Sequence, residues 1–271
     1  SGCASQGFVL ERRVDPVRRA YYELPKDSKG ALVSRVIAGT SAYGSLEPED
    51  ILLSVDGVAV DELGFYKDPR FGPQRALLLF NRTPDGRARE NGDMLNVRVF
   101  REGQVRTVAI KLRSYSGAGE RIPWTIKGQP PYLVENGLLF LELSVPLVRQ
   151  LFGKNWERKA IELAYLYKTR RFYEEPGEDR IVILAGALPD PVTRGYDQIQ
   201  GAPVVTLDGK PVKNLKSLRE KVLRLQKEGA DRATLRLTGD RKVFLDIKNR
   251  DAINGRINQR YQIPKSSPWD S

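Results

Sequence analysis

A short stretch of sequence occurs twice in this chain, once near each end. Leu53–Leu63 reads LSVDGVAVDEL, and Val205–Leu215 reads VTLDGKPVKNL. Each copy predicts a short apolar strand, a tight turn and a second short strand, because Asp-Gly between apolar residues favours the two-residue turns of β-hairpins. At the same spacing, the β-like run Ala31–Gly44 aligns with Ile183–Tyr196. The sequence therefore predicts two copies of one small fold.

The rest of the chain can be divided around these two copies. A length of 271 residues is enough for two ordinary domains, each with a modest core. Between them, RSYSGAGERIPWTIKGQPP is rich in Ser, Gly, Pro and charge, which is typical of a semi-extended linker. We expect a first domain over 1–115, a linker over 116–131, a second domain over 132–248, and a C-terminal helix and tail over 249–271.

The spacing of apolar residues predicts the elements of both domains. Strands are expected at Ala31–Ile37, Ile51–Val55, Met94–Phe100, Val105–Leu112, Gly137–Leu143, Arg180–Leu184 and Val204–Leu207. Helices are expected at Pro16–Tyr22, Gln74–Arg82, Pro146–Phe152, Glu157–Tyr167 and Asn214–Lys227.

Charge and cysteine content limit the classes of partner. The net charge of +11 is compatible with nucleic-acid binding, but Lys and Arg are spread over all segments without a basic tract or an aromatic platform. We therefore expect no specific nucleic-acid binding. The apolar runs are too short to span a bilayer, so no transmembrane segment is expected. Cys3 is the single cysteine, which excludes an internal disulfide; it is either a lipidated first residue of a processed lipoprotein or an ordinary residue after an arbitrary cut.

The absence of histidine removes the commonest catalytic devices. A Ser-His-Asp or Cys-His system needs an imidazole to take and return the proton, and the sequence has none. Neither a phosphate-binding nor a dinucleotide-binding glycine motif is present. The acidic pairs Glu174-Glu175 and Glu178-Asp179 flank Pro176-Gly177, which is typical of a solvated turn. We expect a chain without catalytic residues, metal ligands or cofactors.

The order of several motifs resembles a known family. The run GALVSRVIAGTSAYGSLEPEDILLSVDGVAV, Gly30–Val60, resembles the centre of a PDZ domain as found in HtrA/Deg proteases. PRFGPQRALLLF, PPYLVENGLLFLELS and RYQIP then follow in an order similar to the tandem PDZ region of plant-type and related bacterial Deg proteases. The resemblance implies an α+β chain of two PDZ-like domains, each a partly open β-barrel or sandwich capped by helices.

This resemblance also implies a site. PDZ domains bind an extended peptide by strand addition, and backbone N–H groups of a glycine loop hold the terminal carboxylate. The matching loop is Ser5-Gln6-Gly7-Phe8, although Gln6 stands where an apolar residue is usual. The peptide strand would pair beside Val9 and Leu10. The expected helix at Gln74–Arg82 would form the other wall, with Gln74, Leu77 and Leu78 as candidate contacts and the remaining leucine in the core.

In the second copy the loop matches Glu135-Asn136-Gly137-Leu138. In the proteases that the chain resembles, the second PDZ domain serves assembly more than substrate capture, and the strongly apolar strand after this loop, Gly137–Leu143, fits that role. The resemblance thus implies the regulatory, oligomerising part of a serine endopeptidase of protein quality control, with the protease domain outside this chain, unfolded or C-terminal peptides as partners, and a bacterial periplasm or envelope location. The alternative is a stand-alone PDZ scaffold or lipoprotein that never carried a protease.

Overall fold

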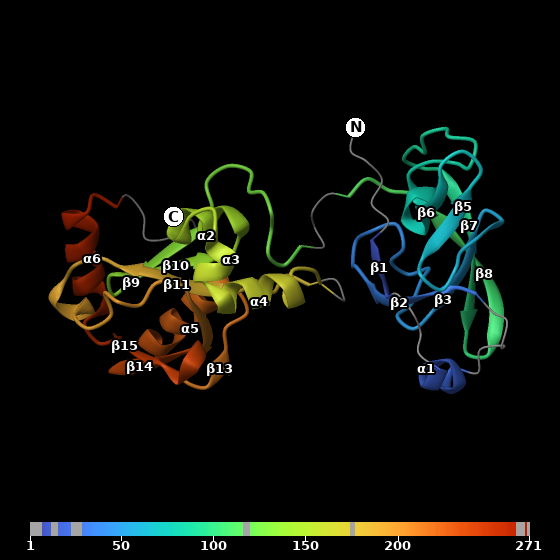
Figure 1. The fold of residues 1–271 in the computed structure, drawn as a ribbon. Helices are drawn as coiled ribbons and strands as arrows, with labels where there is room; N and C mark the ends of the chain where they lie inside the picture. Colours follow the sequence, from blue (N-terminus) through green and yellow to red (C-terminus); the bar gives the residue numbers. More distant parts are fainter. Residues whose placement is uncertain are drawn as a thin grey trace. The chain divides into compact units, whose positions relative to one another are not determined.

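The computed structural model describes residues 7–11, 16–22, 29–115, 120–173, 177–263 and 269. The chain divides into two compact units (Figure 1): Ser1–Gly119 with Phe172–Pro176, and Glu120–Arg171 with Gly177–Ser271. Residues 120–131, which the sequence places in a linker, belong to the second unit, because Glu120 pairs with Arg171 and Ile122 is 1% exposed in its core. Residues 116–119 of the expected linker lie outside the described residues.

The first unit is an antiparallel sheet with short helical segments. Its elements are β1 (Phe8–Glu11), α1 (Pro16–Tyr21), β2 (Ala31–Val36), β3 (Ile51–Val55), β4 (Val58–Ala59), β5 (Phe65–Asp68), β6 (Gly72–Arg75), the 3₁₀ helix η1 (Ala76–Phe80), β7 (Met94–Arg101) and β8 (Gln104–Lys111). The strand order is β1-β2-β3-β7-β8, with β4 paired to β3 and a separate β5–β6 hairpin. β7 shows why the chain is extended here: Leu95, Val97 and Val99 alternate into the core, while Met94, Asn96 and Arg98 between them are exposed.

The helix expected at Gln74–Arg82 is wrong. Gln74 lies in β6 opposite Tyr66, and only the five residues of η1 are helical. No side chain caps the first turn at Arg75, and Pro73 and Pro84 limit the run on either side. Ala76, Leu79 and Phe80 are all fully buried, so η1 is held by core packing rather than by an amphipathic stripe.

The second unit repeats this sheet and adds to it. Its elements are β9 (Tyr132–Glu135), β10 (Leu138–Glu142), α2 (Val145–Phe152), α3 (Trp156–Lys159), α4 (Ile161–Arg170), β11 (Val182–Ala187), η2 (Pro191–Thr193), β12 (Ala202–Leu207), β13 (Lys210–Pro211), α5 (Leu215–Lys227), β14 (Arg232–Leu237), η3 (Thr238–Asp240), β15 (Lys242–Asp246) and α6 (Arg250–Arg260). The strand order is β9-β10-β11-β12-β14-β15, with β13 paired to β12. The mixture of helices and antiparallel sheets confirms the predicted α+β class.

The repeated Asp-Gly motif plays one structural role in both copies. Asp56-Gly57 joins β3 to β4 and Asp208-Gly209 joins β12 to β13, and all four residues have positive φ. Each Asp then fastens its hairpin to the next strand of the sheet. The carboxylate of Asp56 accepts the N–H of Asn96 on β7 at 2.8 Å, and the carboxylate of Asp208 accepts the N–H of Thr234 on β14 at 2.7 Å.

The two strand orders match element by element. β1 corresponds to β10, β2 to β11 and β3 to β12, and both the β1–β2 and β10–β11 pairs carry a register shift early in the first strand. The second copy differs around β10 in two ways: β9 extends the sheet beyond β10, and the helices α2, α3 and α4 stand between β10 and β11 in the sequence.

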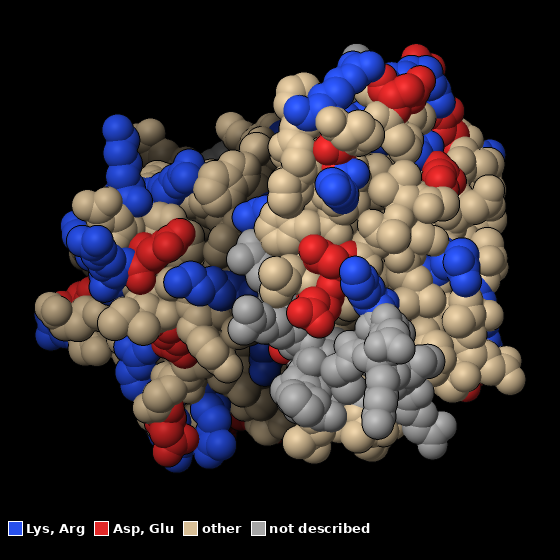
Figure 2. All heavy atoms as spheres, turned by 45° about the vertical axis from the view of Figure 1, so that its right-hand side comes forward, with Lys and Arg blue, Asp and Glu red and all other residues tan. Residues whose placement is uncertain are grey.

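The charges of the described surface are mixed. On the face shown in Figure 2, Lys and Arg side chains alternate with Asp and Glu rather than forming one basic field. No helix of the described residues is long and apolar enough to cross a bilayer. Within the same residues no group of three acidic or cysteine side chains is placed to hold a metal ion.

Candidate functional site

Gly7 fixes the start of β1 in the first copy. Its φ is +76°, and a Cβ atom at this position would lie 1.8 Å from the Thr40 hydroxyl oxygen. The carbonyl of Gly7 accepts the N–H of Ile37 at 2.7 Å, and Thr40 donates to the carbonyl of Ile37 at 2.6 Å. Only glycine fits here, because Thr40 occupies the space of a side chain. Ser5 and Gln6, the first half of the expected loop, lie outside the described residues.

The outer edge of β1 presents backbone groups to solvent. β1 ends the strand order, and no strand of the described residues pairs with its other side. The carbonyls of Gly7 and Val9 both face β2, where they accept from Ile37 and from the Ser34 hydroxyl. Because successive residues of a strand direct their backbone groups to opposite edges, the N–H and C=O of Phe8 face outward. This edge can accept one additional strand.

The 3₁₀ helix η1 lies along the side chains of β1. The rings of Phe8 and Phe80 stack edge-to-face at 5.0 Å. Near the other end of β1, Gly64 lies against Leu10, and the carbonyl of Gly64 accepts the N–H of Ala76, the first residue of η1, at 2.8 Å. η1 therefore stands in the place of the longer helix expected from the sequence.

The other three residues predicted to contact a peptide, Gln74, Leu77 and Leu78, have different surroundings in the structure. Leu77 and Leu78 lie on η1, the element that also carries Phe80. Both side chains are partly buried and pack against the core that contains Phe8 of β1. Gln74 lies in β6, where its amide donates to the carbonyl of Phe71 at 3.3 Å. Gln74 thus faces its own hairpin, whereas Leu77 and Leu78 remain candidates for contact with a ligand.

In the second copy the corresponding edge is already occupied. β9 pairs antiparallel with β10 over its whole length, from Leu138 opposite Glu135 to Leu141 opposite Tyr132. The turn between the strands is Asn136-Gly137, with φ of +50° and +76°. The predicted loop Glu135-Asn136-Gly137-Leu138 is therefore a two-residue hairpin turn and not an open glycine loop.

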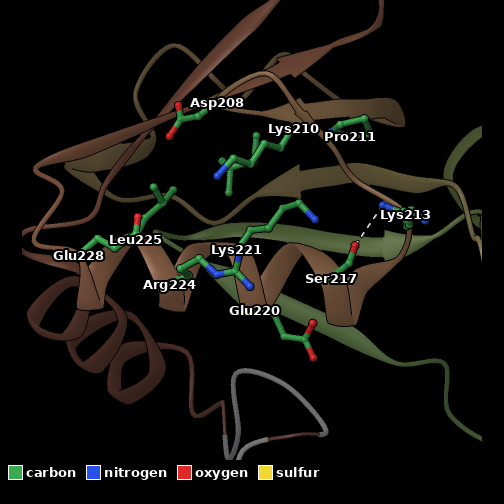
Figure 3. Close-up of a pocket in the computed structure, with 11 residues that line it drawn as sticks. Asp208, Lys210, Pro211, Lys213, Ser217, Glu220, Lys221, Arg224, Leu225 and Glu228 are labelled. Carbon is green, nitrogen blue, oxygen red and sulfur yellow. Dashed lines mark hydrogen bonds between the residues drawn. The ribbon is translucent and has the colours of Figure 1, made fainter.

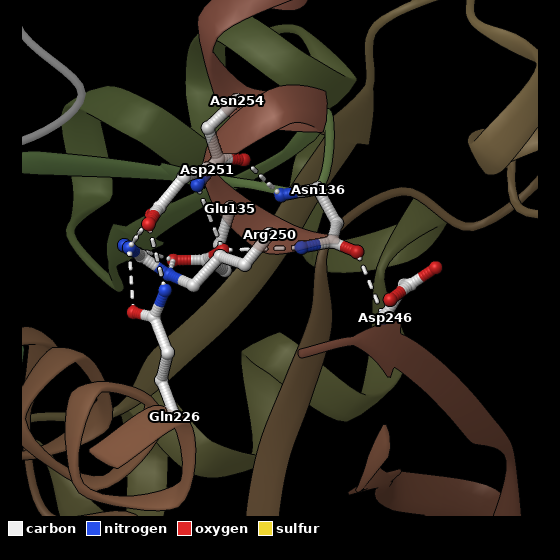
Figure 4. A network of polar contacts seen from close by, with 7 residues as sticks. All are labelled: Glu135, Asn136, Gln226, Asp246, Arg250, Asp251 and Asn254. Carbon is white, nitrogen blue, oxygen red and sulfur yellow. Dashed lines mark hydrogen bonds and ion pairs between the residues drawn. The ribbon is translucent and has the colours of Figure 1, made fainter. Parts of the chain in front are cut away.

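Helix α6 holds β9 in place through a buried polar network (Figure 4). The Glu135 side chain is 1% exposed, and its carboxylate accepts from both Arg250 nitrogens, Nε at 3.0 Å and Nη2 at 2.9 Å, and from the Asn254 amide at 2.9 Å. The backbone N–H of Asn136 donates to the side-chain oxygen of Asn254 at 2.8 Å. The side-chain oxygen of Asn136 accepts the N–H of Asp246, also at 2.8 Å. The backbone N–H and the side chain of Asn136 thus both have internal partners.

The apolar strand of the second copy is not a surface. Leu138 and Phe140 are 1% and 0% exposed, because β9 covers the strand's edge and β10 contributes to the core of the unit. The edge of this strand is therefore not free for an intersubunit contact, and the role of the second copy in assembly remains a prediction. The sequence did contain a signal for the covering strand. In YLVENGLLF, Asn-Gly stands between two apolar runs, which is a signature of a β-hairpin.

Glu142 ends β10 in an unusual environment for a carboxylate. Burial raises the pKa of its side chain above the ordinary value, and a hydrogen bond from the N–H of Leu215 together with the charge of Arg180 opposes this shift in part.

Comparisons with known proteins agree with this architecture. A profile of the PDZ domain family matches residues 123–269, just over half of the chain, and the chain therefore belongs to the PDZ domain family. It is also similar to Protease Do-like 2, chloroplastic, of Arabidopsis thaliana, with 27% identity over 80% of this chain and 34% of the relative. Putative protease Do-like 12, mitochondrial, of the same plant is 24% identical over 93% of this chain and 42% of the relative.

These relatives confirm the resemblance to Deg-type proteases and define its extent. The chain spans about a third to under a half of the length of the relatives it matches, and the family that its sequence matches is that of PDZ domains. The compartments in the relatives' names are chloroplast and mitochondrion, so they give no support to the bacterial envelope that the sequence resemblance suggested.

Proposed function

We propose that the first copy binds an extended peptide by strand addition to β1. One observation carries this proposal: the outer edge of β1 has no strand partner among the described residues, whereas β9 covers the equivalent edge of β10. A peptide would exchange hydrogen bonds with the outward backbone groups of Phe8 and lie near Leu77 and Leu78. The N–H groups around Gly7 would receive a terminal carboxylate.

The second copy has a different role in this proposal. Because its edge is filled by its own chain, it supports intersubunit contacts rather than peptide capture. The surface that supports this role is on α4, where Ile161 and Tyr165 lie one turn apart and are 73% and 63% exposed.

At the level of the whole protein, we propose the regulatory and oligomerising part of an HtrA/Deg-type serine endopeptidase that recognises unfolded or C-terminal peptide segments. The similarity to Do-like proteases over nearly the whole chain supports this reading. A stand-alone PDZ scaffold is the alternative. The coding sequence upstream of Ser1 separates the two, since a histidine-bearing trypsin-like domain there supports only the first.

The peptide site is tested by titrating a hydrophobic peptide into the isotopically labelled chain, once with a free C-terminal carboxylate and once amidated. We expect saturable chemical-shift changes at Gly7, Phe8 and Val9, weaker binding of the amidated form, and unchanged resonances along Leu138–Glu142.

A pair of variants sharpens this experiment. Val9 on β1 and Val205 on β12 are both 44% exposed strand residues. Val9→Asp places a negative charge beside the peptide and should weaken binding at least tenfold, whereas Val205→Asp should change it less than twofold. Equal effects of the two variants, or shifts at β10 instead of β1, would overturn the proposal.

A further inference from the structure

A hollow in the second unit lies apart from both strand edges. It is enclosed by the β12–β13 hairpin on one side and helix α5 on the other, and its volume is about 340 Å³ (Figure 3). Leu207, Pro211 and Leu225 supply apolar walls. The hollow is therefore a depression between two rigid elements, and the proposed peptide site does not use it.

Four basic side chains line this hollow. Lys210 and Lys213 come from the hairpin and the segment after it, and Lys221 and Arg224 lie one turn apart on α5. No ion pair or hydrogen bond within the described part of the chain engages any of these four side chains. Like charges gathered around an apolar hollow repel one another unless an anion lies between them.

Three carboxylates also line the hollow: Asp208, Glu220 and Glu228. Asp208 uses its carboxylate to accept the N–H of Thr234 at 2.7 Å, within the hairpin attachment described above. Glu220 stands on α5, and Glu228 is the C-cap residue of the same helix (Figure 3). The lining therefore holds four basic and three acidic side chains, a net charge of +1.

The first copy shows that the fold alone does not produce this arrangement. Where the second copy has Lys210-Pro211, the first has Val58-Ala59, and Asp61 aligns with Lys213. The basic residues are thus specific to one copy of the repeat, although the hairpin they stand on is common to both.

We propose that this hollow binds a small, soluble phosphate-bearing molecule. Lysines on opposite walls can contact different oxygens of one tetrahedral anion, which carries more charge than a carboxylate and so compensates more of the repulsion. The hollow has room for a phosphate together with a short organic body or a second phosphate, and the apolar walls strengthen the ionic contacts by excluding water.

The probes are inorganic phosphate, pyrophosphate and glycerol 2-phosphate, titrated at constant ionic strength into the labelled chain, with acetate as the carboxylate comparison. We expect saturable shifts over Lys210–Arg224, tighter binding of pyrophosphate than of phosphate, and no saturable shifts with acetate. A gain for glycerol 2-phosphate over phosphate assigns the ligand as an ester, and equal affinity assigns free phosphates.

Helix α5 offers a matched control, because Lys216 is exposed on the same helix without lining the hollow. Lys221→Gln should weaken pyrophosphate binding at least tenfold and Lys216→Gln less than twofold, with the same circular dichroism for both. Equal losses from the two variants, or no saturable shift with any phosphate, would falsify the site. Peptide binding at β1 should be unchanged in Lys221→Gln, so failure of this proposal and failure of the peptide proposal are distinguishable.

Discussion

Gly7 is the residue on which the shape of the proposed peptide edge depends most. Gly7→Ala combines a positive φ with a Cβ that overlaps Thr40, so we expect it to destabilise the first unit by about 3 kcal/mol. Gly57→Ala is the control, because it has a similar φ of +81° and no atom within 4 Å of the added Cβ; it should cost only about 1 kcal/mol. Denaturant unfolding monitors both, and equal losses would show that Thr40 is not the constraint.

Glu142 gives the chain a pH-dependent contribution at a single residue. Because burial raises its pKa in the folded protein, the folded state keeps the proton to a higher pH than the unfolded state does. The stability contributed by the protonated form is therefore lost as pH rises from about 4.5 towards the folded pKa.

Glu142→Gln removes this titration while its side-chain oxygen can still accept from Leu215. The free energy of unfolding of the variant relative to the wild type should be lowest at pH 3, rise as the pH increases towards the folded pKa of Glu142, and level off above it. A difference that is constant with pH would contradict the assignment.

At the scale of elements, α6 and β9 act together to close the second copy. Arg250→Met removes the partner of a carboxylate that is 1% exposed, and an unpaired buried charge costs about 3–5 kcal/mol. We expect faster hydrogen exchange along β9 and α6 and little change in the first unit. Lys248→Met is the control, since Lys248 and Asp231 form an exposed pair worth little, and it should leave exchange unchanged.

The elements also show what could be predicted from the sequence. The Asp-Gly hairpins, the alternating strands and the capped helix α5 were predictable because local pattern and tertiary role agree. The short 3₁₀ helix η1 was not predictable in this way. Its four successive apolar residues, Leu77–Phe80, are compatible with a longer helix, and packing in the core determines how many turns they form. The occupied edge of β10 was missed because resemblance to a peptide-binding loop outweighed the local turn signal of Asn136-Gly137.

For the whole molecule, the two copies share the same core strand order but differ at one edge. Among the described residues the outer edge of β1 has no partner strand, whereas β9 covers the equivalent edge of β10; the other end strands of the two sheets are β8, β9 and β15. The Asn136-Gly137 turn indicates this division locally, whereas the long-range pairing of Glu135 with Arg250 that holds β9 in place has no local signal in the sequence.

The proposed assembly can be measured at this scale. Ile161→Glu with Tyr165→Glu adds two charges to the exposed face of α4, and we expect sedimentation to shift from an oligomer towards the monomer. Phe71→Glu is the comparison, because Phe71 is 69% exposed in the first unit, and it should leave the sedimentation coefficient unchanged. A wild-type chain that is monomeric at high micromolar concentration would exclude the assembly role.

The Asn136-Gly137 turn also determines when the edge of the second copy is covered during folding. A hairpin closed by two residues forms in about 1–10 μs, and loop-closure entropy favours the shortest connection. β11 is separated from β10 by residues 143–181, so β9 reaches β10 first. β10 therefore gains one neighbour as it leaves the ribosome, and this edge is protected from pairing with other nascent chains before the rest of its sheet exists.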